Sequence, residues 1–292
     1  GPQDRDSTIF GHKSFLVIAD HFARHGIAVL RYDERGIGKS TGNFAEATTE
    51  DLAADVEDLL EWLKQDERID SNRLHLIGHS EGGIVAPMVA ARRDDLASII
   101  LLAGPTVTGA KIVLNQTRRI AAAAGADEAV LDAQEKMMKR VIETLDSGKL
   151  DVDFVETVIE QAKAAMPEEK RSQFNLNDAA KARIVALDSP WFRFFLQHDP
   201  APALRDVKCH VLMINAAEDL QVDPALNLPI AEKISANRTN GHFEVLLLPG
   251  LNHLFQECED GSPAKYAQIE QTFSPLVLKK MVDWITNLGD GG

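Results

Sequence analysis

Short apolar runs alternate with amphipathic segments in both outer parts of this chain. Apolar runs bounded by glycine, proline or polar residues predict strands at 27–32, 73–77, 99–103, 210–214 and 243–248. Hydrophobic residues at helical spacing predict helices at 12–25, 83–91, 226–236 and 275–288. They also predict a helix with an apolar stripe over 52–63, which Thr48 or Thr49 can cap. This alternation indicates an α/β fold, a mostly parallel sheet with helices on both faces.

The alternation stops in the middle of the chain. Residues 106–207 are rich in Ala, Glu, Lys and Arg, show helical periodicity without a clear strand, and predict helices at 120–124, 130–145 and 154–165. A helical block inserted between two strands of a parallel sheet is typical of a cap over the sheet. We therefore expect a core in two parts, 1–105 and 208–292, and a helical cap at 106–207.

Composition and net charge limit the kinds of molecule that this protein is expected to bind. The chain has 292 residues, 45% of them hydrophobic, so it can bury a large core. Its net charge of −14 argues against nucleic acid or an anionic membrane surface as the main partner. Cys209 and Cys258 form neither a disulfide framework nor a metal-binding spacing, and Cys209 opens an apolar strand as a small core residue.

Location depends on what precedes the first residue. No signal peptide or membrane-length apolar run is visible in the sequence. We expect a cytoplasmic protein if the chain is complete, and a periplasmic or secreted one if a signal sequence precedes it.

The most informative motif is a G-x-S-x-G pentapeptide at 78–82, between the apolar run 73–77 and the apolar helix 83–91. A serine on the sharp turn between a strand and a helix takes up a strained backbone conformation and exposes its Oγ at the carboxyl end of the sheet. We expect glycines at this turn because side chains there would clash. The sequence therefore predicts Ser80 as a nucleophile.

Another glycine-rich loop, at 33–42, follows the predicted strand 27–32. It lacks the G-x-x-x-x-G-K-[ST] spacing of a phosphate-binding loop, so a nucleotide site is a poor interpretation.

A serine nucleophile needs a base and an acid that orients the base. Reactive groups gather at the carboxyl ends of parallel strands, and the order serine, acid, histidine fits this architecture. His253 follows the strand 243–248, and Asp219 follows the strand 210–214. We predict His253 as the base and Asp219 as the acid, with Glu218 facing solvent and Asp223 capping the next helix.

The oxyanion that forms during acyl transfer needs backbone N–H donors. One predicted donor is the amide of Glu81, which follows the nucleophile. The second should come from residues 1–6; Pro2 has no N–H, which leaves Gln3, Gly1 or a residue upstream. We expect His79 to pack under the turn, because its side chain starts on the wrong side to act as a base.

Several motifs together resemble the bacterial serine esterases of the serine-aminopeptidase-like class in the α/β-hydrolase superfamily. They span almost the whole chain: GPQDRD at 1–6, RYDERGIGKSTG at 31–42, GHSEGG at 78–83, SPWFRFF at 189–195, EDLQV at 218–222 and NHLFQ at 252–256. The resemblance implies an α/β-hydrolase fold, Ser80, Asp219 and His253 as the triad, a cap over the acyl pocket, and small carboxylic esters as substrates.

The resemblance also raises a question about the sheet. Members of this group have strands before the first motif, and one of them lies in mid-sheet, between the strands that match 27–32 and 73–77. A parallel sheet without that strand would leave two rows of backbone groups unpaired. We expect either upstream residues that supply it or a different arrangement of the sheet.

The leading hypothesis is a serine carboxylesterase that works through an acyl-enzyme, with no metal or organic cofactor. Trp191, Phe192, Phe194 and Phe195 either line the acyl pocket or anchor the cap to the core. A peptidase, amidase or thioesterase would use the same triad, and a ligand-binding protein on a hydrolase scaffold is a further alternative. An interfacial lipase fits less well, since the cap helices lack a wide bulky apolar face.

Overall fold

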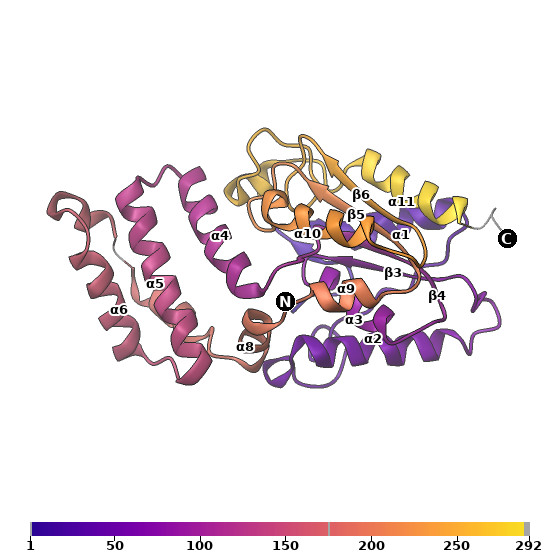
Figure 1. Cartoon of the computed structure of the whole chain (residues 1–292), viewed down its shortest axis with the longest axis horizontal. Coiled ribbons are helices and arrows are strands. Elements are labelled where there is room, and N and C mark those ends of the chain that lie inside the picture. The colour runs from indigo at the N-terminus through magenta and orange to yellow at the C-terminus, as the bar shows by residue number, and fades with distance from the viewer. Residues whose placement is uncertain (1, 175, 289–292) are drawn as a thin grey trace.

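The computed structural model describes residues 2–174 and 176–288 (Figure 1). In this part of the chain the main sheet has four parallel strands in the order β3-β4-β5-β6. Their bounds are β3 (Leu74–His79), β4 (Leu96–Leu102), β5 (His210–Ala216) and β6 (Phe243–Leu248). A short antiparallel pair, β1 (Thr8–Ile9) and β2 (His12–Lys13), precedes them.

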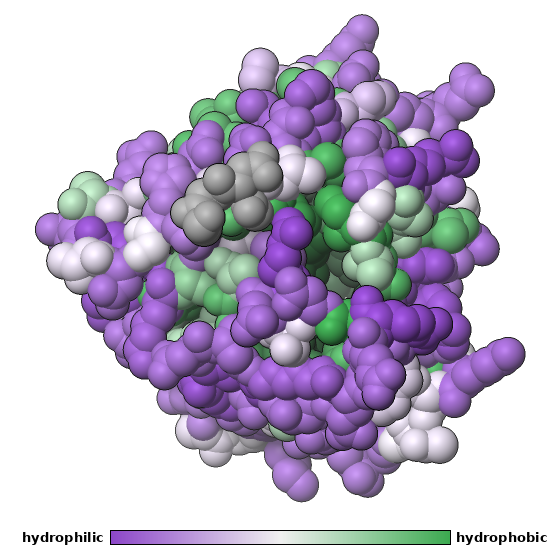
Figure 2. Space-filling model, turned by 90° about the vertical axis from the view of Figure 1, so that its right-hand side faces the viewer, coloured by the Kyte–Doolittle hydropathy of each residue, from purple (hydrophilic) through white to green (hydrophobic). Residues whose placement is uncertain are grey.

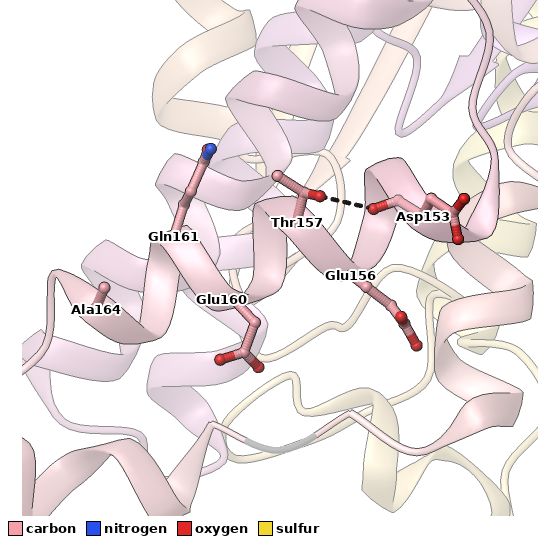
Figure 3. A pocket seen from close by; sticks show the side chains of 6 residues that line it. All are labelled: Asp153, Glu156, Thr157, Glu160, Gln161 and Ala164. Atoms are coloured by element: carbon pink, nitrogen blue, oxygen red, sulfur yellow. Dashed lines mark hydrogen bonds between the residues drawn. The ribbon is translucent and has the colours of Figure 1, made fainter.

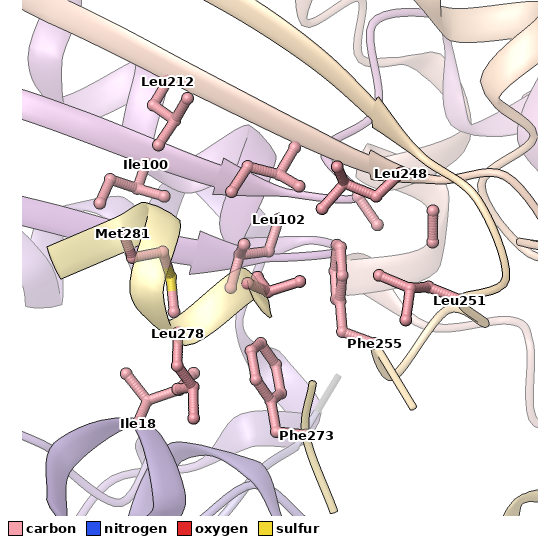
Figure 4. Close-up of a cluster of buried hydrophobic side chains, with 14 of the residues drawn as sticks. Ile18, Ile100, Leu102, Leu212, Leu248, Leu251, Phe255, Phe273, Leu278 and Met281 are labelled. Carbon is pink, nitrogen blue, oxygen red and sulfur yellow. The ribbon is translucent and has the colours of Figure 1, made fainter. Parts of the chain in front are cut away.

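Alternate side chains of the strands build two cores, because successive residues of a strand point to opposite faces. Ile100 and Leu102 of β4 pack with α1 (Ser14–Arg24) and α11 (Pro275–Asn287), and Figure 4 shows Ile18, Leu278 and Met281 of these helices beside them. On the other face, Ile99 and Leu101 pack with α2 (Thr49–Leu63), α3 (Gly82–Ala91) and part of α10 (Pro224–Ala236). The sheet is therefore covered on both faces, as predicted.

Local signals fix where the core helices begin. Thr48 and Asp51 form a capping box at the start of α2, which satisfies backbone donors that the first turn leaves unpaired. Asp223 caps α10 by accepting from the amide of Ala225 at 3.0 Å, so the cap predicted there is confirmed.

The segment between β4 and β5 is helical in its described residues, and Figure 1 shows most of it as a separate layer beside the sheet. Its elements are α4 (Gly109–Ala123), α5 (Glu128–Ser147), α6 (Val152–Ala164), η2 (Glu168–Gln173), α7 (Asp178–Val185), α8 (Pro190–Gln197) and α9 (Ala201–Asp206). Residues of α4 to α8, with Met137 and Val141 among them, form a core of their own. α9 differs, because its Leu204 packs with the sheet, so the core resumes before residue 207.

The prediction of a strand at 27–32 is wrong for this structure. These residues have no strand assignment, although β3 to β6 all form where comparable apolar runs stand. At the start of this segment the amide of Ile27 donates to the carbonyl of Phe22. Just past its end the amide of Glu34 donates to the carbonyl of Gln3. An apolar run becomes a strand only when a neighbouring strand pairs with it. Here Val29 and Leu30 are 38% and 39% exposed.

A cavity of about 1170 Å³ separates this segment from β3. Residues 26–32 and residues 73–80 line it, together with residues of α1 and α2. β3 pairs with β4 alone among the described strands, so the cavity occupies the position of the mid-sheet strand that the resemblance implies. Figure 2 shows a hollow with hydrophobic walls on the face that it draws.

Candidate active site

The serine turn has the geometry that its motif predicts. Ser80 follows β3 directly, lies just before α3, and has φ of +54°, in the left-handed region that residues other than glycine rarely adopt. Its amide donates to the carbonyl of Leu102 on β4 at 2.9 Å, and its carbonyl accepts from the amide of Gly83 at 2.8 Å. Bonds to the neighbouring strand and to the helix start thus hold the strained residue in place.

The glycines of the turn do not all serve the same purpose. A Cβ at Gly78 would lie 1.9 Å from the carbonyl oxygen of Gly82, and one at Gly83 would lie 2.4 Å from Cα of Gly104. A Cβ at Gly82 would meet no atom within 4 Å. The predicted steric reason therefore holds for Gly78 and for Gly83, which lies outside the pentapeptide, but it is wrong for Gly82.

Asp219 and His253 meet as the sequence predicts. Nδ1 of His253 donates to Oδ2 of Asp219 at 2.7 Å, and both side chains are buried, with 5% and 0% of each residue exposed. The other carboxylate oxygen, Oδ1, accepts from the amides of Gln221 at 2.7 Å and Val222 at 2.9 Å. The bond to a carboxylate places the proton on Nδ1, so Nε2 carries the lone pair that can accept a proton.

The loop that carries His253 is held by two residues that the sequence analysis did not single out. Oδ1 of Asn252 accepts from the amides of Leu254 and Gln256, both at 3.0 Å, and its Nδ2 donates to Oε1 of Gln256 at 2.9 Å. Both side chains are fully buried, and Phe255 between them has φ of +59°. The motif NHLFQ carried the signal, because two amides that flank a histidine can close a tight loop on themselves.

His79 is also a structural partner of His253. Nε2 of His79 donates to the backbone carbonyl of His253 at 2.8 Å, and the two rings lie 4.7 Å apart. Burial, followed by the charge of His253, lowers the pKa of His79 to about 3. His79 therefore stays neutral and supports the loop, which agrees with the packing role predicted for it.

Ser80 and His253 line the same cavity, the one that separates β3 from residues 26–32. Among the hydrogen bonds of the described residues there is none between Ser80 Oγ and the imidazole of His253. Bonds between a nucleophile and its base are commonly long in an enzyme without substrate and shorten when substrate binds.

The predicted oxyanion donors differ in their surroundings. Glu81 is the residue after the serine and the N-cap residue of α3, at the end of the helix where backbone amides have no partner within the helix. The amide of Gln3 instead donates to Oε2 of Glu34 at 3.0 Å, so in this structure it serves a carboxylate. Burial raises the pKa of Glu34 to about 7. The assignment of Gln3 as the second donor is therefore not supported by this geometry.

The aromatic residues of α8 lie on the cap side of the turn. Trp191 stacks on Phe195 with ring centres 5.9 Å apart, and Phe192 lies 5.8 Å from Trp191. The described residues that line the cavity beside Ser80 do not include any of the three. Phe195 contacts the core of the cap and both cores of the sheet, which favours the anchoring role over the acyl-pocket role for this side chain.

Three further observations concern the described residues outside this site. A shallow depression on α6, shown in Figure 3, is lined by side chains of that one helix, among them Asp153 and Glu160. In the described residues, no group of three or more His, Cys, Asp or Glu side chains could hold a metal ion. No helix within 2–174 and 176–288 is both long enough and apolar enough to cross a membrane.

The sequence of this chain matches a known protein family. A family model described as serine aminopeptidase, S33, matches residues 12–255, which is most of the chain. The chain belongs to this family of α/β hydrolases. A curated relative, esterase EstD of Thermotoga maritima, is 26% identical over 91% of this chain. The chain spans only 55% of that relative's length.

Solved structures show the same fold. An α/β hydrolase named GrgF from Penicillium sp. sh18 superposes with a TM-score of 0.57 at 18% identity, over 98% of this chain and 86% of that one. A thermophilic esterase from Thermogutta terrifontis superposes with a TM-score of 0.51 at 19% identity, over 98% of this chain and 87% of that one. This S33-family chain therefore has the α/β-hydrolase fold, and the predicted fold class is confirmed.

Proposed function

We propose that this protein is a serine carboxylesterase that cleaves small carboxylic esters through an acyl-enzyme. The observation that carries the proposal is the buried 2.7 Å bond between His253 and Asp219, beside a cavity that Ser80 also lines. A histidine whose Nδ1–H is fixed by a buried carboxylate presents Nε2 as a base, and a strained serine facing the same space is its natural proton donor.

The reaction has two halves. Ser80 Oγ attacks the ester carbonyl carbon while its proton passes to Nε2 of His253, and the amide of Glu81 donates to the oxyanion. The bond from the carbonyl carbon to the alcohol oxygen breaks, and His253 returns the proton to the leaving alcohol. Water then attacks the acyl-enzyme by the same route and releases the acid and Ser80. Asp219 stabilises the imidazolium in both halves.

A fluorophosphonate probe tests the nucleophile. We expect the probe to label the wild type and to leave Ser80→Ala unlabelled, with hydrolysis of p-nitrophenyl acetate lowered at least about 10⁴-fold. Ser7→Ala is the matched control, because Ser7 lines the same cavity and also has positive φ, at 52°. Labelling of Ser80→Ala would contradict the proposal, as would loss of labelling in Ser7→Ala.

A substrate panel tests the type of bond. The family model is described as an aminopeptidase, whereas the curated relative is named an esterase. We expect p-nitrophenyl esters of short acids to be hydrolysed faster than the matching thioesters and aminoacyl amides. Faster turnover of an aminoacyl amide would favour the peptidase alternative. Probe binding without turnover of any of the three would favour a ligand-binding protein on this scaffold.

A further inference from the structure

A buried carboxylate joins the serine turn to the cap. Glu81, next to Ser80, is 9% exposed. Its Oε1 accepts from Nε1 of Trp191 on α8 at 2.6 Å and from Oγ1 of Thr49 at the start of α2 at 2.8 Å. A buried charge is costly unless hydrogen bonds compensate it, so these donors are part of what keeps the carboxylate in this place.

α8 is in turn held firmly by the rest of the cap. The guanidinium of Arg193 donates to the carboxylate of Asp188, to the carbonyl of Gly148 at 2.5 Å and to the carbonyl of Leu145 on α5. The carbonyl of Phe195 lies 2.1 Å from where a Cβ on Gly109 would be, so α8 and α4 touch backbone to backbone. A shift of the cap therefore moves α8 and, with it, Trp191.

We propose that Glu81 is a positioning residue that locks cap helix α8 to the serine turn. Its side chain binds the cap through Trp191, while its own backbone amide is the oxyanion donor of the proposed reaction. The position of the cap is thereby coupled to the donor that stabilises the transition state. This inference rests on the proposed serine hydrolase, because the coupling has a consequence for rate only if Glu81 donates to an oxyanion.

A double-mutant cycle tests the lock. Trp191→Phe keeps a ring that can stack on Phe195 but removes the indole donor, and Glu81→Ala removes the acceptor. We expect each to lower kcat for a p-nitrophenyl ester about tenfold, the effect of one hydrogen bond to a charged group, and the double variant to fall no further. Glu81→Gln, which retains an oxygen acceptor, should recover most of the rate. Additive losses would overturn the proposal.

The chain offers a matched control for the loss of an indole donor. Trp284 is buried far from the turn in sequence and donates from Nε1 to Oγ of Ser98 at 3.2 Å. Trp284→Phe therefore removes a comparable bond from the core, and we expect kcat to stay near that of the wild type. A loss of kcat equal to that of Trp191→Phe would show a general loss of stability and would overturn the proposed lock.

A spectroscopic readout separates the lock from the reaction. With Trp62 and Trp284 replaced by Phe, Trp191 remains as the one tryptophan of the chain, since the sequence has 3. We expect Glu81→Ala to shift the fluorescence emission of Trp191 to longer wavelength, because the indole becomes more exposed to solvent. Ser80→Ala should leave this emission unchanged. Unchanged emission in Glu81→Ala would refute the lock even if the esterase is confirmed. Hydrolysis by Ser80→Ala would refute the proposed function, whatever the emission shows.

Discussion

The serine turn lies between two unlike flanks of the sheet. On one flank β4 pairs with β3, β5 with β4 and β6 with β5, and Asp219 and His253 follow the carboxyl ends of β5 and β6. On the other flank, residues 27–32 have an equally apolar sequence but form no strand, and a cavity separates them from β3. The difference shows that an apolar run specifies a strand only when hydrogen-bonding partners stand beside it.

The two flanks also differ in the surroundings of their buried carboxylates. The carboxylate of Asp219 is buried and accepts bonds from a ring nitrogen and two backbone amides. On the open flank, which residues 27–34 form, the carboxylate of Glu34 accepts a hydrogen bond from the amide of Gln3, and burial raises the pKa of Glu34. Asp219 thus accepts three hydrogen bonds, whereas burial of Glu34 disfavours the charged form of its carboxyl group.

The largest expected loss of kcat follows from a substitution on the paired flank, the one formed by β4, β5 and β6. Asp219→Asn should lower kcat about 10⁴-fold, because an amide can stabilise the wrong tautomer of His253 and cannot neutralise an imidazolium. Steady-state hydrolysis of a p-nitrophenyl ester measures this effect. The control is Asp223→Asn, which keeps a helix-capping side chain and should retain near wild-type kcat. A tenfold or smaller loss in Asp219→Asn would contradict its role as the acid.

Core substitutions compare the two flanks directly. Ile100→Ala on β4 removes a side chain that is 0% exposed and should lower the free energy of unfolding by about 2–5 kcal/mol. Leu30→Ala, on the unpaired segment, should cost less than about 1 kcal/mol, because that residue is 39% exposed. Urea denaturation of both variants measures the difference. A cost for Leu30→Ala as large as that for Ile100→Ala would show that the segment is packed in solution.

Substitution in the loop that carries His253 should have an intermediate effect. Asn252→Ala leaves the amides of Leu254 and Gln256 without their acceptor, and we expect it to lower stability by about 1–3 kcal/mol and to lower kcat as His253 loses its support. Thermal denaturation and ester hydrolysis measure the two effects. The control is Asn237→Ala, because this exposed asparagine donates from Nδ2 to the carbonyl of Lys233 in its own helix, and we expect neither stability nor kcat to change.

The last prediction concerns the pH dependence of stability on the flank formed by residues 27–34. Burial raises the pKa of Glu34 from 4.5 to about 7, so the folded state favours the protonated carboxyl group. Its contribution to stability is complete below pH 4.5 and is lost as the pH rises through about 7. Glu34→Gln should flatten the fall in melting temperature across that range. An unchanged slope in the variant would show that other groups cause the fall.

Much of the site could be predicted from the sequence because its signals are local. The turn at Ser80 follows from glycines placed between a strand and a helix, and the positions of Asp219 and His253 follow from where parallel strands end. The helix caps at Thr48 and Asp223 likewise depend on residues within one turn of the chain. The hydrogen bond between Asn252 and Gln256 joins residues four apart in the sequence, so it could also be predicted from local signals.

Contacts between distant segments could not be predicted in this way. The sequence by itself determined the α/β alternation, the inserted helices and the three residues of the predicted triad, because periodicity and strand ends are properties of neighbouring residues. Only the tertiary structure decided that 27–32 remains unpaired, that Gln3 meets Glu34, and that Glu81 binds Trp191. Each of these depends on which segments pack side by side, and that packing depends on the fold as a whole.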